Sequence, residues 1–160
     1  MIDFSCRRKG FSITELLVTM AIIAVIAAVA LPLAETSVKR GKEIELRRNL
    51  RLLRESIDAY KKLADENKFE FDEETYGYPP DLETLVEGVE ITEKENDREI
   101  VKLIRFLRRV PRDPMTNSTE WGKRSYQDDP DTQSWGGQNV YDVSTRSPGT
   151  GLDGTKYTDW

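Results

Sequence analysis

A run of 19 residues without a charged side chain constrains this chain more than any other feature of its sequence. It extends from Leu16 to Ala34 and reads LLVTMAIIAVIAAVALPLA. As a helix this run would be about 28 Å long, close to the thickness of the hydrocarbon core of a bilayer. Residues 1–10, which precede it, carry three basic side chains and one acidic side chain. This basic flank predicts a cytoplasmic N-terminus, with the rest of the chain following across a single membrane span.

A secretory signal peptide that is later removed is the simplest alternative interpretation of this segment. The apolar part of such peptides has about 7–15 residues, so the uncharged run is long for one. The residues Pro32, Leu33 and Ala34 are also a poor match to the small-residue cleavage site that a signal peptide needs. We therefore expect a retained membrane helix, and no second apolar run of this length follows it in the sequence.

The position of Glu15 makes the N-terminus more informative than an ordinary anchor. A carboxylate inside an apolar helix costs about 2.5–3.5 kcal/mol on insertion scales and needs a partner. Cleavage of the bond between Gly10 and Phe11 would supply one, because the new α-amino group is positively charged near neutral pH. The attraction between this ammonium and Glu15 is strong at low dielectric, within one chain or between neighbouring chains. A simple membrane anchor with Glu15 at the interface is the alternative.

The segment RRKG-FSITELLVTMAIIAVIAAVALP resembles the class III signal of type IV pilin-like proteins. The resemblance implies that a prepilin peptidase cuts between Gly10 and Phe11 and methylates the new N-terminus, which becomes N-methylphenylalanine. It also implies that Phe11, Glu15 and Pro32 act in assembly, when the mature chain leaves the inner membrane for a helical filament. The implied parts are a leader (1–10), a transmembrane and filament-core helix (11–34), its amphipathic continuation (35–65) and a periplasmic globular head (66–160).

A repeating apolar stripe predicts that the helix continues beyond the membrane-spanning part. Its members recur at intervals of three or four residues and are Leu46, Leu50, Leu53, Ile57, Tyr60 and Leu63. We predict one helix over residues 11–65, perturbed at Pro32, with Gly41 as a second weak point. The stripe covers under three heptads, which favours contact with a globular core over a free coiled coil. Four arginines lie off the stripe and are expected to be solvated: Arg47, Arg48, Arg51 and Arg54.

Charge is segregated along the chain after the apolar run. Residues 39–62 contain nine basic and four acidic side chains, whereas residues 65–99 contain fourteen acidic and three basic ones. Each stretch is by default a solvated face. In a stack of identical subunits, however, the basic stretch of one copy would lie near the acidic stretch of another and steer their register. Both interpretations remain open at this point.

Short elements are predicted for the rest of the chain. A helix begins near Asp81 and carries an apolar face of Leu82, Leu85 and Val86. A second amphipathic helix is expected over residues 97–109, ended by VPRDP, whose two prolines favour extended backbone and a turn. A strand over residues 139–144 is expected to pair with residues 124–127. The predicted fold class is therefore α+β: a long N-terminal helix packed on a small head with short helices and a short antiparallel sheet.

Two blocks of the head carry a narrower resemblance. YPPDLETLVEG and FLRRVPRDPMTN resemble blocks of the protein G family, the major pseudopilins of type II secretion systems. The chain departs from that pattern at Met115 and Thr116, where the family has an aromatic residue and a glycine, and in the extra residues 118–120. For Asp113 and Pro114, a plain turn without a role in a filament is the alternative interpretation.

The C-terminal segment RSPGTGLDGTKYTDW has no disulfide to hold it, so it needs another staple. Calcium would suit it, because this ion accepts six to eight oxygen ligands. The resemblance to protein G implies such a calcium loop, with Ser144, Asp153 and Asp159 as the donors by position. A metal-free turn packed by Tyr157 and Trp160 is the alternative.

The composition excludes several enzyme classes. The chain has no histidine and one cysteine, Cys6, which removes histidine-based catalytic triads, disulfide frameworks and cysteine-rich zinc modules. The net charge of −5 argues against a nucleic-acid binder. Spacing alone assigns no pair of carboxylates as acid and base. We therefore expect no enzyme, although a tethered enzyme or binding module is the competing class.

The expected function is structural. The resemblance implies a subunit of a type II secretion pseudopilus, a filament that pushes folded proteins through the outer-membrane secretin; a type IV pilus or competence pilin is the alternative. The implied partners are further copies of the chain, prepilin peptidase, minor pseudopilins, the inner-membrane assembly platform with its ATPase, and the secretin. The implied location is the inner membrane of a Gram-negative bacterium, with the leader cytoplasmic, the head periplasmic and the assembled pseudopilus in the periplasm.

Overall fold

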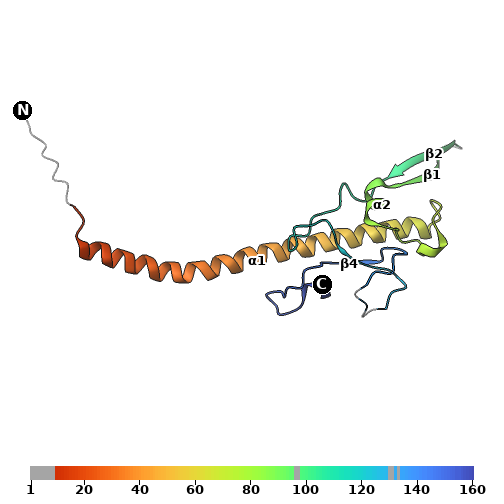
Figure 1. Cartoon of the computed structure of the whole chain (residues 1–160). Helices are drawn as coiled ribbons and strands as arrows, with labels where there is room; N and C mark the ends of the chain where they lie inside the picture. The colour runs from red at the N-terminus through yellow and green to blue at the C-terminus, as the bar shows by residue number, and fades with distance from the viewer. Residues whose placement is uncertain (1–9, 96–97, 130–131, 133) are drawn as a thin grey trace, which may run out of the picture. The chain divides into compact units, whose positions relative to one another are not determined.

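The chain forms a long helix followed by a head of short elements, an α+β fold that confirms the predicted class (Figure 1). The computed structural model describes residues 10–95, 98–129, 132 and 134–160. It divides into two compact units, Met1–Lys39 and Arg40–Trp160. In chain order the elements are α1 (Ile13–Asp65), the 3-10 turn η1 (Glu73–Thr75), α2 (Leu82–Glu87), β1 (Val89–Glu95), β2 (Arg98–Ile104), β3 (Gly122–Arg124), β4 (Asp142–Ser144) and the 3-10 turn η2 (Tyr157–Asp159).

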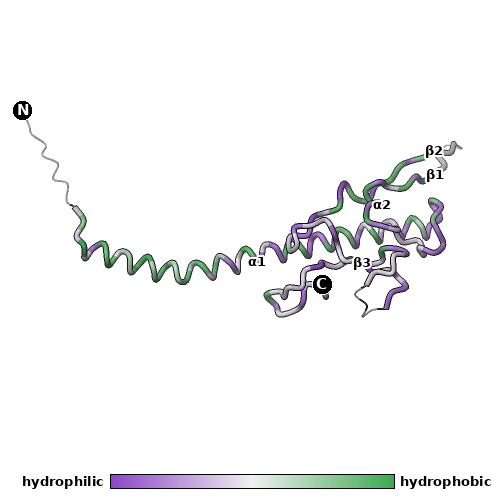
Figure 2. The backbone as a smooth tube through the Cα atoms, in the orientation of Figure 1, coloured by the Kyte–Doolittle hydropathy of each residue, from purple (hydrophilic) through white to green (hydrophobic). Residues whose placement is uncertain are grey.

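The first part of α1 is apolar on every side. In Figure 2 its tube is almost continuously green, whereas the part that belongs to the second unit alternates between green and purple. α1 runs through Pro32 without a break, so the perturbation expected there does not end the helix. The Thr36 hydroxyl donates a hydrogen bond to the Pro32 carbonyl at 2.9 Å. Within the described residues, α1 is long and apolar enough to cross a membrane.

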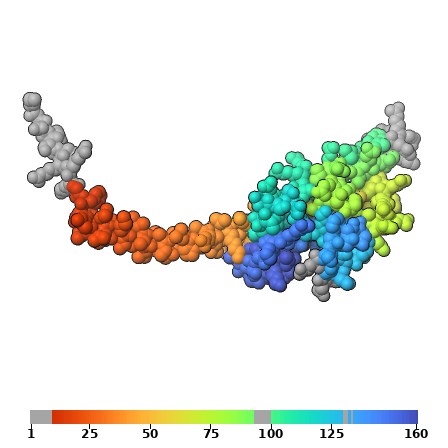
Figure 3. Space-filling view, in the orientation of Figure 1, coloured from red at the N-terminus to blue at the C-terminus, as the bar shows by residue number. Residues whose placement is uncertain are grey.

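The predicted stripe on α1 forms the centre of the core in the second unit, hereafter the head unit. Five of its six members are buried, and Leu63 is half-buried. The stripe therefore contacts a globular core, as its short length indicated. The core also takes in side chains from later elements, which lie over the helix in the space-filling view (Figure 3). The buried cluster consists of Leu46, Leu50, Leu53, Ile57, Tyr60, Leu82, Leu85, Leu107, Trp121, Val140, Val143 and Tyr157.

Helix α2 begins where its sequence predicts, directly after Asp81. The Asp81 carboxylate accepts a hydrogen bond from the Thr84 amide at 2.7 Å, which caps the first turn. Gly88 ends the helix with a positive φ of 86°. An added Cβ at Gly88 would lie 2.3 Å from the Ile104 carbonyl oxygen, so only glycine allows the chain to approach β2 here.

The predicted amphipathic helix over residues 97–109 is wrong. Asp97 lies outside the described residues, and residues 98–104 form β2, which pairs antiparallel with β1 from Val89 opposite Ile104 to Glu95 opposite Arg98. The β-branched residues of β2 favour a strand. Its pairing partner, residues 89–95, cannot be recognised from the spacing of apolar residues within 97–109 alone. The expected apolar side is not buried as one face, because Ile100 and Leu103 are exposed while Leu107 enters the core after the strand ends.

The second sheet is present but shorter than predicted, because only residues 142–144 of the expected strand 139–144 form β4. β4 pairs antiparallel with β3, with Gly122 opposite Ser144 and Arg124 opposite Asp142. The expected partner segment of 124–127 is thus displaced by two residues toward the N-terminus. Residues 125–127 instead form loop contacts, in which the Ser125 hydroxyl donates to the Asn139 carbonyl at 2.9 Å.

Candidate processing and assembly site

The residues around the predicted cleavage site are open to contact from outside the chain. Gly10 precedes α1, and the side chain of Phe11 is 82% exposed. A Cβ added to Gly10 would meet no described atom within 4 Å. The chain's own packing does not require glycine at this position. A requirement for glycine would therefore come from a second molecule that must approach the backbone closely, as a peptidase does.

Glu15 lies in the first turn of α1, where the helix dipole favours a negative charge. The helix starts at Ile13, and the Leu16 amide donates to the Ser12 carbonyl at 3.0 Å. Over residues 10–95 and the later described ranges, the Glu15 side chain has no hydrogen-bond or ion-pair partner. A positive group near the first turn of α1 would lie close to the Glu15 carboxylate. The chain end that cleavage would create, at Phe11, is only four residues before Glu15.

The apolar part of α1 is uncovered in the isolated chain. Its large side chains are exposed from Phe11 to Leu33, at between 52% and 82% of their full area. A soluble chain rarely leaves such a continuous apolar surface open to water, so lipid or other helices must cover it. Pro32 lies near the end of this surface. Glu15 and Pro32 thus lie in α1 and Phe11 lies two residues before it, and all three side chains are exposed.

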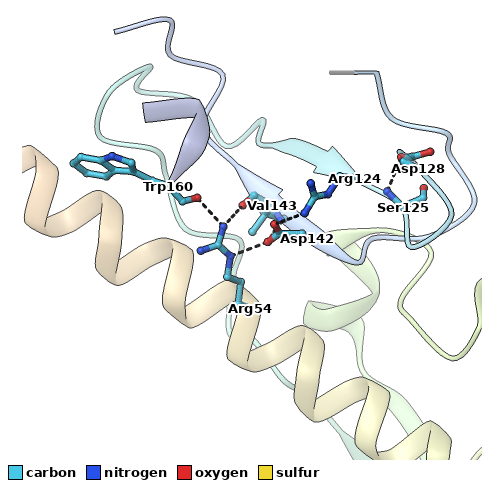
Figure 4. Close-up of polar contacts among 7 residues, drawn as sticks. All are labelled: Arg54, Arg124, Ser125, Asp128, Asp142, Val143 and Trp160. Atoms are coloured by element: carbon cyan, nitrogen blue, oxygen red, sulfur yellow. Dashed lines mark hydrogen bonds and ion pairs between the residues drawn. The ribbon is translucent and has the colours of Figure 1, made fainter. Parts of the chain in front are cut away.

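A clasp of polar contacts holds the C-terminal residues against α1 (Figure 4). The Arg54 guanidinium donates from Nε to Asp142 Oδ1 at 2.7 Å, and from Nη2 to the main-chain oxygens of Val143 at 3.1 Å and Trp160 at 2.7 Å. Arg124 reaches the other oxygen of Asp142 at 3.2 Å. The expectation that Arg54 is solvated is therefore wrong: this side chain is half-buried and ties β4 and η2 to the helix.

Glu43 is buried about one helical turn before Leu46, the first residue of the stripe, and it holds the C-terminal segment against α1. The carboxylate of Glu43 accepts hydrogen bonds from the Tyr157 hydroxyl and the Leu152 amide, both at 2.9 Å. Burial, followed by this hydrogen bond and the charge of Glu43, raises the pKa of Tyr157 to about 12. Sequence reasoning missed Glu43. Its spacing of three residues before Leu46 places it on the buried stripe, which is the signal that could have found it.

The VPRDP block is a structural turn inside the head unit. Asp113 is fully buried, and its carboxylate accepts hydrogen bonds from the Met115 amide at 2.8 Å, the Thr116 hydroxyl at 3.1 Å and the Thr145 hydroxyl. The Trp121 indole donates to the Pro111 carbonyl at 3.0 Å. These contacts fix the loop before β3 and favour the interpretation of Asp113 as a turn residue.

Two of the three predicted calcium donors have other hydrogen-bond partners in the head unit. Asp153 accepts hydrogen bonds from Arg47 at 2.9 Å and from the Thr155 hydroxyl at 2.6 Å, and its pKa is lowered by Thr155 first and by Arg47 after it. Asp159 accepts from the Thr158 hydroxyl at 3.2 Å, and Ser144 lies in β4. Within the described ranges, no three carboxylates or thiolates lie close enough together to hold a metal ion. Calcium stays a prediction, and Asp153 would have to exchange Arg47 for the ion.

The comparisons with known proteins agree with the N-terminal geometry. Residues 5–31 match the family model described as the prokaryotic N-terminal methylation motif. No curated protein and no solved structure matches the chain.

The matched motif indicates a type IV pilin-like or pseudopilin-type subunit. It also supports processing by a prepilin peptidase, methylation and pilus-like assembly. The long apolar helix is compatible with a single-pass membrane anchor.

Proposed function

We propose that the chain is a structural subunit of a type II secretion pseudopilus. The observation that carries the proposal is the methylation motif at residues 5–31 joined to an apolar helix that is exposed on every side. The resemblance of YPPDLETLVEG and FLRRVPRDPMTN to protein G blocks favours the pseudopilus over a type IV pilus or competence pilus. A filament subunit needs no catalytic residues, so the proposal assigns none.

The proposed mechanism starts at the N-terminus. The prepilin peptidase cuts between Gly10 and Phe11 in the inner membrane and methylates the new terminus. The ammonium group of Phe11 then pairs with Glu15, in the same chain or in its neighbour, where the low dielectric makes the attraction strong. This pairing draws each added subunit into register as the assembly platform and its ATPase extract it.

The apolar residues 11–34 would form the filament core, because packing against identical helices covers them as fully as lipid does. The head unit, which is rich in charged side chains, would form the surface in the periplasm. Minor pseudopilins and the secretin are the other proposed partners. Repeated addition of subunits at the inner membrane would push a folded cargo outward.

The test has two parts in the native host. The intact mass and N-terminal peptide of the membrane-extracted protein should show a terminus at methylated Phe11. Deletion of the gene should then leave folded secretory proteins in the periplasm while surface pili are unchanged. Loss of surface pili or of DNA uptake with normal secretion would instead assign the chain to a pilus. An uncut Met1, or a cut after Ala34, would refute the filament proposal altogether.

A further inference from the structure

Four tyrosines form an exposed aromatic surface on the head unit, hereafter the tyrosine patch: Tyr76, Tyr78, Tyr126 and Tyr141. Their ring centroids lie 5.7 Å apart for Tyr76 and Tyr126, 5.6 Å for Tyr78 and Tyr126, and 5.3 Å for Tyr78 and Tyr141. Tyr76 and Tyr126 are more than half exposed. None of the four hydroxyls makes a hydrogen bond with the part of the chain that the structure describes.

Packing does not account for this patch. Tyr78 is half-buried against the core cluster, whereas the other three tyrosines are exposed. Tyr126 contacts the rings of Tyr76, Tyr78 and Tyr141. Tyrosine gives a large, rigid contact area at a low cost in side-chain entropy, and it is enriched at the centres of protein interfaces. An exposed group of four tyrosines therefore suits a binding surface better than a structural one.

The surroundings of the patch favour a cationic partner. The carboxylates of Asp58 and Asp65 lie near Tyr78, whose pKa is raised by burial first, then by the neighbouring phenols and by these two charges. Lys61 and Arg124 already lie over the rings of Tyr78 and Tyr141, at 5.4 Å and 6.0 Å. Both cations are paired with carboxylates, Lys61 with Asp65 and Arg124 with Asp142.

The two most exposed rings, Tyr76 and Tyr126, carry no cation over the described ranges, and one face of Tyr126 is stacked on Tyr78. The rings of the same patch that do carry cations show that its geometry accepts them.

A complementary surface is present on α1 of the same chain. Arg40, Arg48 and Arg51 project from the side of the helix opposite the buried stripe, hereafter the arginine face. All three side chains are exposed, and none has a hydrogen-bond or ion-pair partner among the described residues. Ile44, between them on this side, is 64% exposed. Farther along the helix the same side turns acidic at Glu55 and Asp58.

We propose that the tyrosine patch of one subunit binds the arginine face of a second copy of the chain. The inference rests on the proposed function as a filament subunit and names the surfaces that neighbouring heads use. A guanidinium stacks on an aromatic face, and Tyr and Arg are the residues that dominate interface energetics. Because the patch and the arginine face are different surfaces, the contact is heterologous, and it repeats into an open polymer when its rotation does not close a ring.

The positions of the two surfaces also set the displacement between neighbours. The patch lies at the level of Lys61, which is 13 residues beyond Arg48 on α1. At the rise of an α-helix this separation is about 20 Å along the axis. A second copy that brings its arginine face to the patch is therefore shifted by about this distance.

Crosslinking tests the contact in the full chain, expressed in its native host with a Cys6→Ser background. One copy carries Tyr126→Cys and a differently tagged copy carries Arg48→Cys. A short bis-maleimide reagent is used, because two long side chains in contact hold their Cα atoms beyond disulfide range. A crosslinked pair with both tags is expected. The control pair of Tyr126→Cys with Arg146→Cys, an exposed arginine that does not line the hollow beside Arg48, should give none.

An exchange of the two side chains tests the chemistry. Tyr126→Ala and Arg48→Ala should each lower the yield of sedimentable filaments about tenfold, with unchanged membrane levels of processed subunit. The double variant Tyr126→Arg, Arg48→Tyr should recover most of the yield, and Arg146→Ala should match wild type.

Two results would overturn the inference: normal yields from both single variants, or equal crosslinking by the control pair. In either case, wild-type filaments that form normally would leave the proposed function intact. A wild-type chain that forms no filament in any condition would remove the proposed function itself.

Discussion

The hydroxyl of Tyr157 donates a hydrogen bond to the carboxylate of Glu43 across 114 residues of sequence, and both side chains are buried. The Leu152 amide donates to the same carboxylate oxygen. A buried charge is costly without such donors. Glu43 therefore fixes where the C-terminal segment contacts α1, and it links these two distant parts of the chain without a disulfide.

Tyr157→Phe should destabilise the head unit by about 1–2 kcal/mol, because a buried carboxylate loses one of its donors. Urea unfolding of the full chain in detergent, followed by tryptophan fluorescence, measures this change; Trp160 lies 5.0 Å from the Tyr157 ring and reports the site. Tyr126→Phe is the matched control, since its hydroxyl has no partner among the described residues. Equal midpoints for the two variants would show that the hydrogen bond contributes nothing.

The hydrogen bond between Tyr157 and Glu43 also predicts that the head unit loses stability at alkaline pH. The pKa of Tyr157 is about 12 in the folded head against an ordinary value of 10.0. The contribution of this hydrogen-bonded phenol to the free energy of unfolding is therefore complete below pH 10, where the folded and unfolded chains both hold the proton. It is lost between pH 10 and pH 12 as the unfolded chain releases the proton. Urea midpoints at pH 8, 10, 11 and 12 should fall more steeply for wild type than for Tyr157→Phe. Parallel curves would contradict the assignment.

Arg47 occupies Asp153, one of the predicted calcium donors, so its substitution tests whether the C-terminal loop binds calcium. Its guanidinium pairs with Asp153 and lies 4.0 Å from the centroid of the Trp160 ring, so the loop already has a cation. The thermal midpoint of wild type should be the same in calcium and in EGTA, whereas Arg47→Ala, which frees Asp153, should gain stability from calcium. Arg109→Ala serves as the control. A wild-type midpoint that falls in EGTA would establish the calcium loop and displace the role of Arg47.

Gly10→Leu should leave uncut precursor in the membrane. No described atom lies within 4 Å of an added Cβ, so the substitution leaves the fold alone and acts only on the approach of the peptidase. Intact mass of the membrane fraction separates the precursor from the mature chain. Efficient cleavage of the variant would remove Gly10 from the proposed processing site.

Glu15→Ala should permit cleavage but lower the filament yield at least tenfold, because the Phe11 ammonium loses its counter-charge at low dielectric. Glu35→Ala is the matched control: Glu35 is an exposed carboxylate on the same helix, just beyond the uncharged run. The readouts are N-terminal mass and sedimentable filament. Normal assembly of Glu15→Ala chains would refute the pairing.

The local signals in the sequence account for the helical parts of the fold. The stripe from Leu46 to Tyr60 and the cap at Asp81 rest on contacts within a few residues, and the structure confirms both. The helix predicted over residues 97–109 rests on apolar residues at helical spacing: Ile100, Leu103, Ile104 and Leu107. What makes residues 98–104 a strand is the pairing of β2 with β1, a contact that a single window does not contain.

The polar anchors of the head are the part that sequence reasoning missed. Arg54 and Glu43 resemble solvated helix residues until their partners near the C-terminus are known. These partners are 88 to 114 residues away in sequence. The N-terminal motif was recognised more easily, because all of its chemistry lies within a few consecutive residues.

The long separation between Glu43 and Tyr157 also orders events in time. Closing a contact across such a stretch is entropically costly and comes late in folding. The stripe on α1 is made early in synthesis, whereas Tyr157 is made 114 residues after Glu43. We expect the head unit to stay loosely packed until residues 142–160 have been made. Synthesis of these residues is thus the step that makes a subunit ready to polymerise.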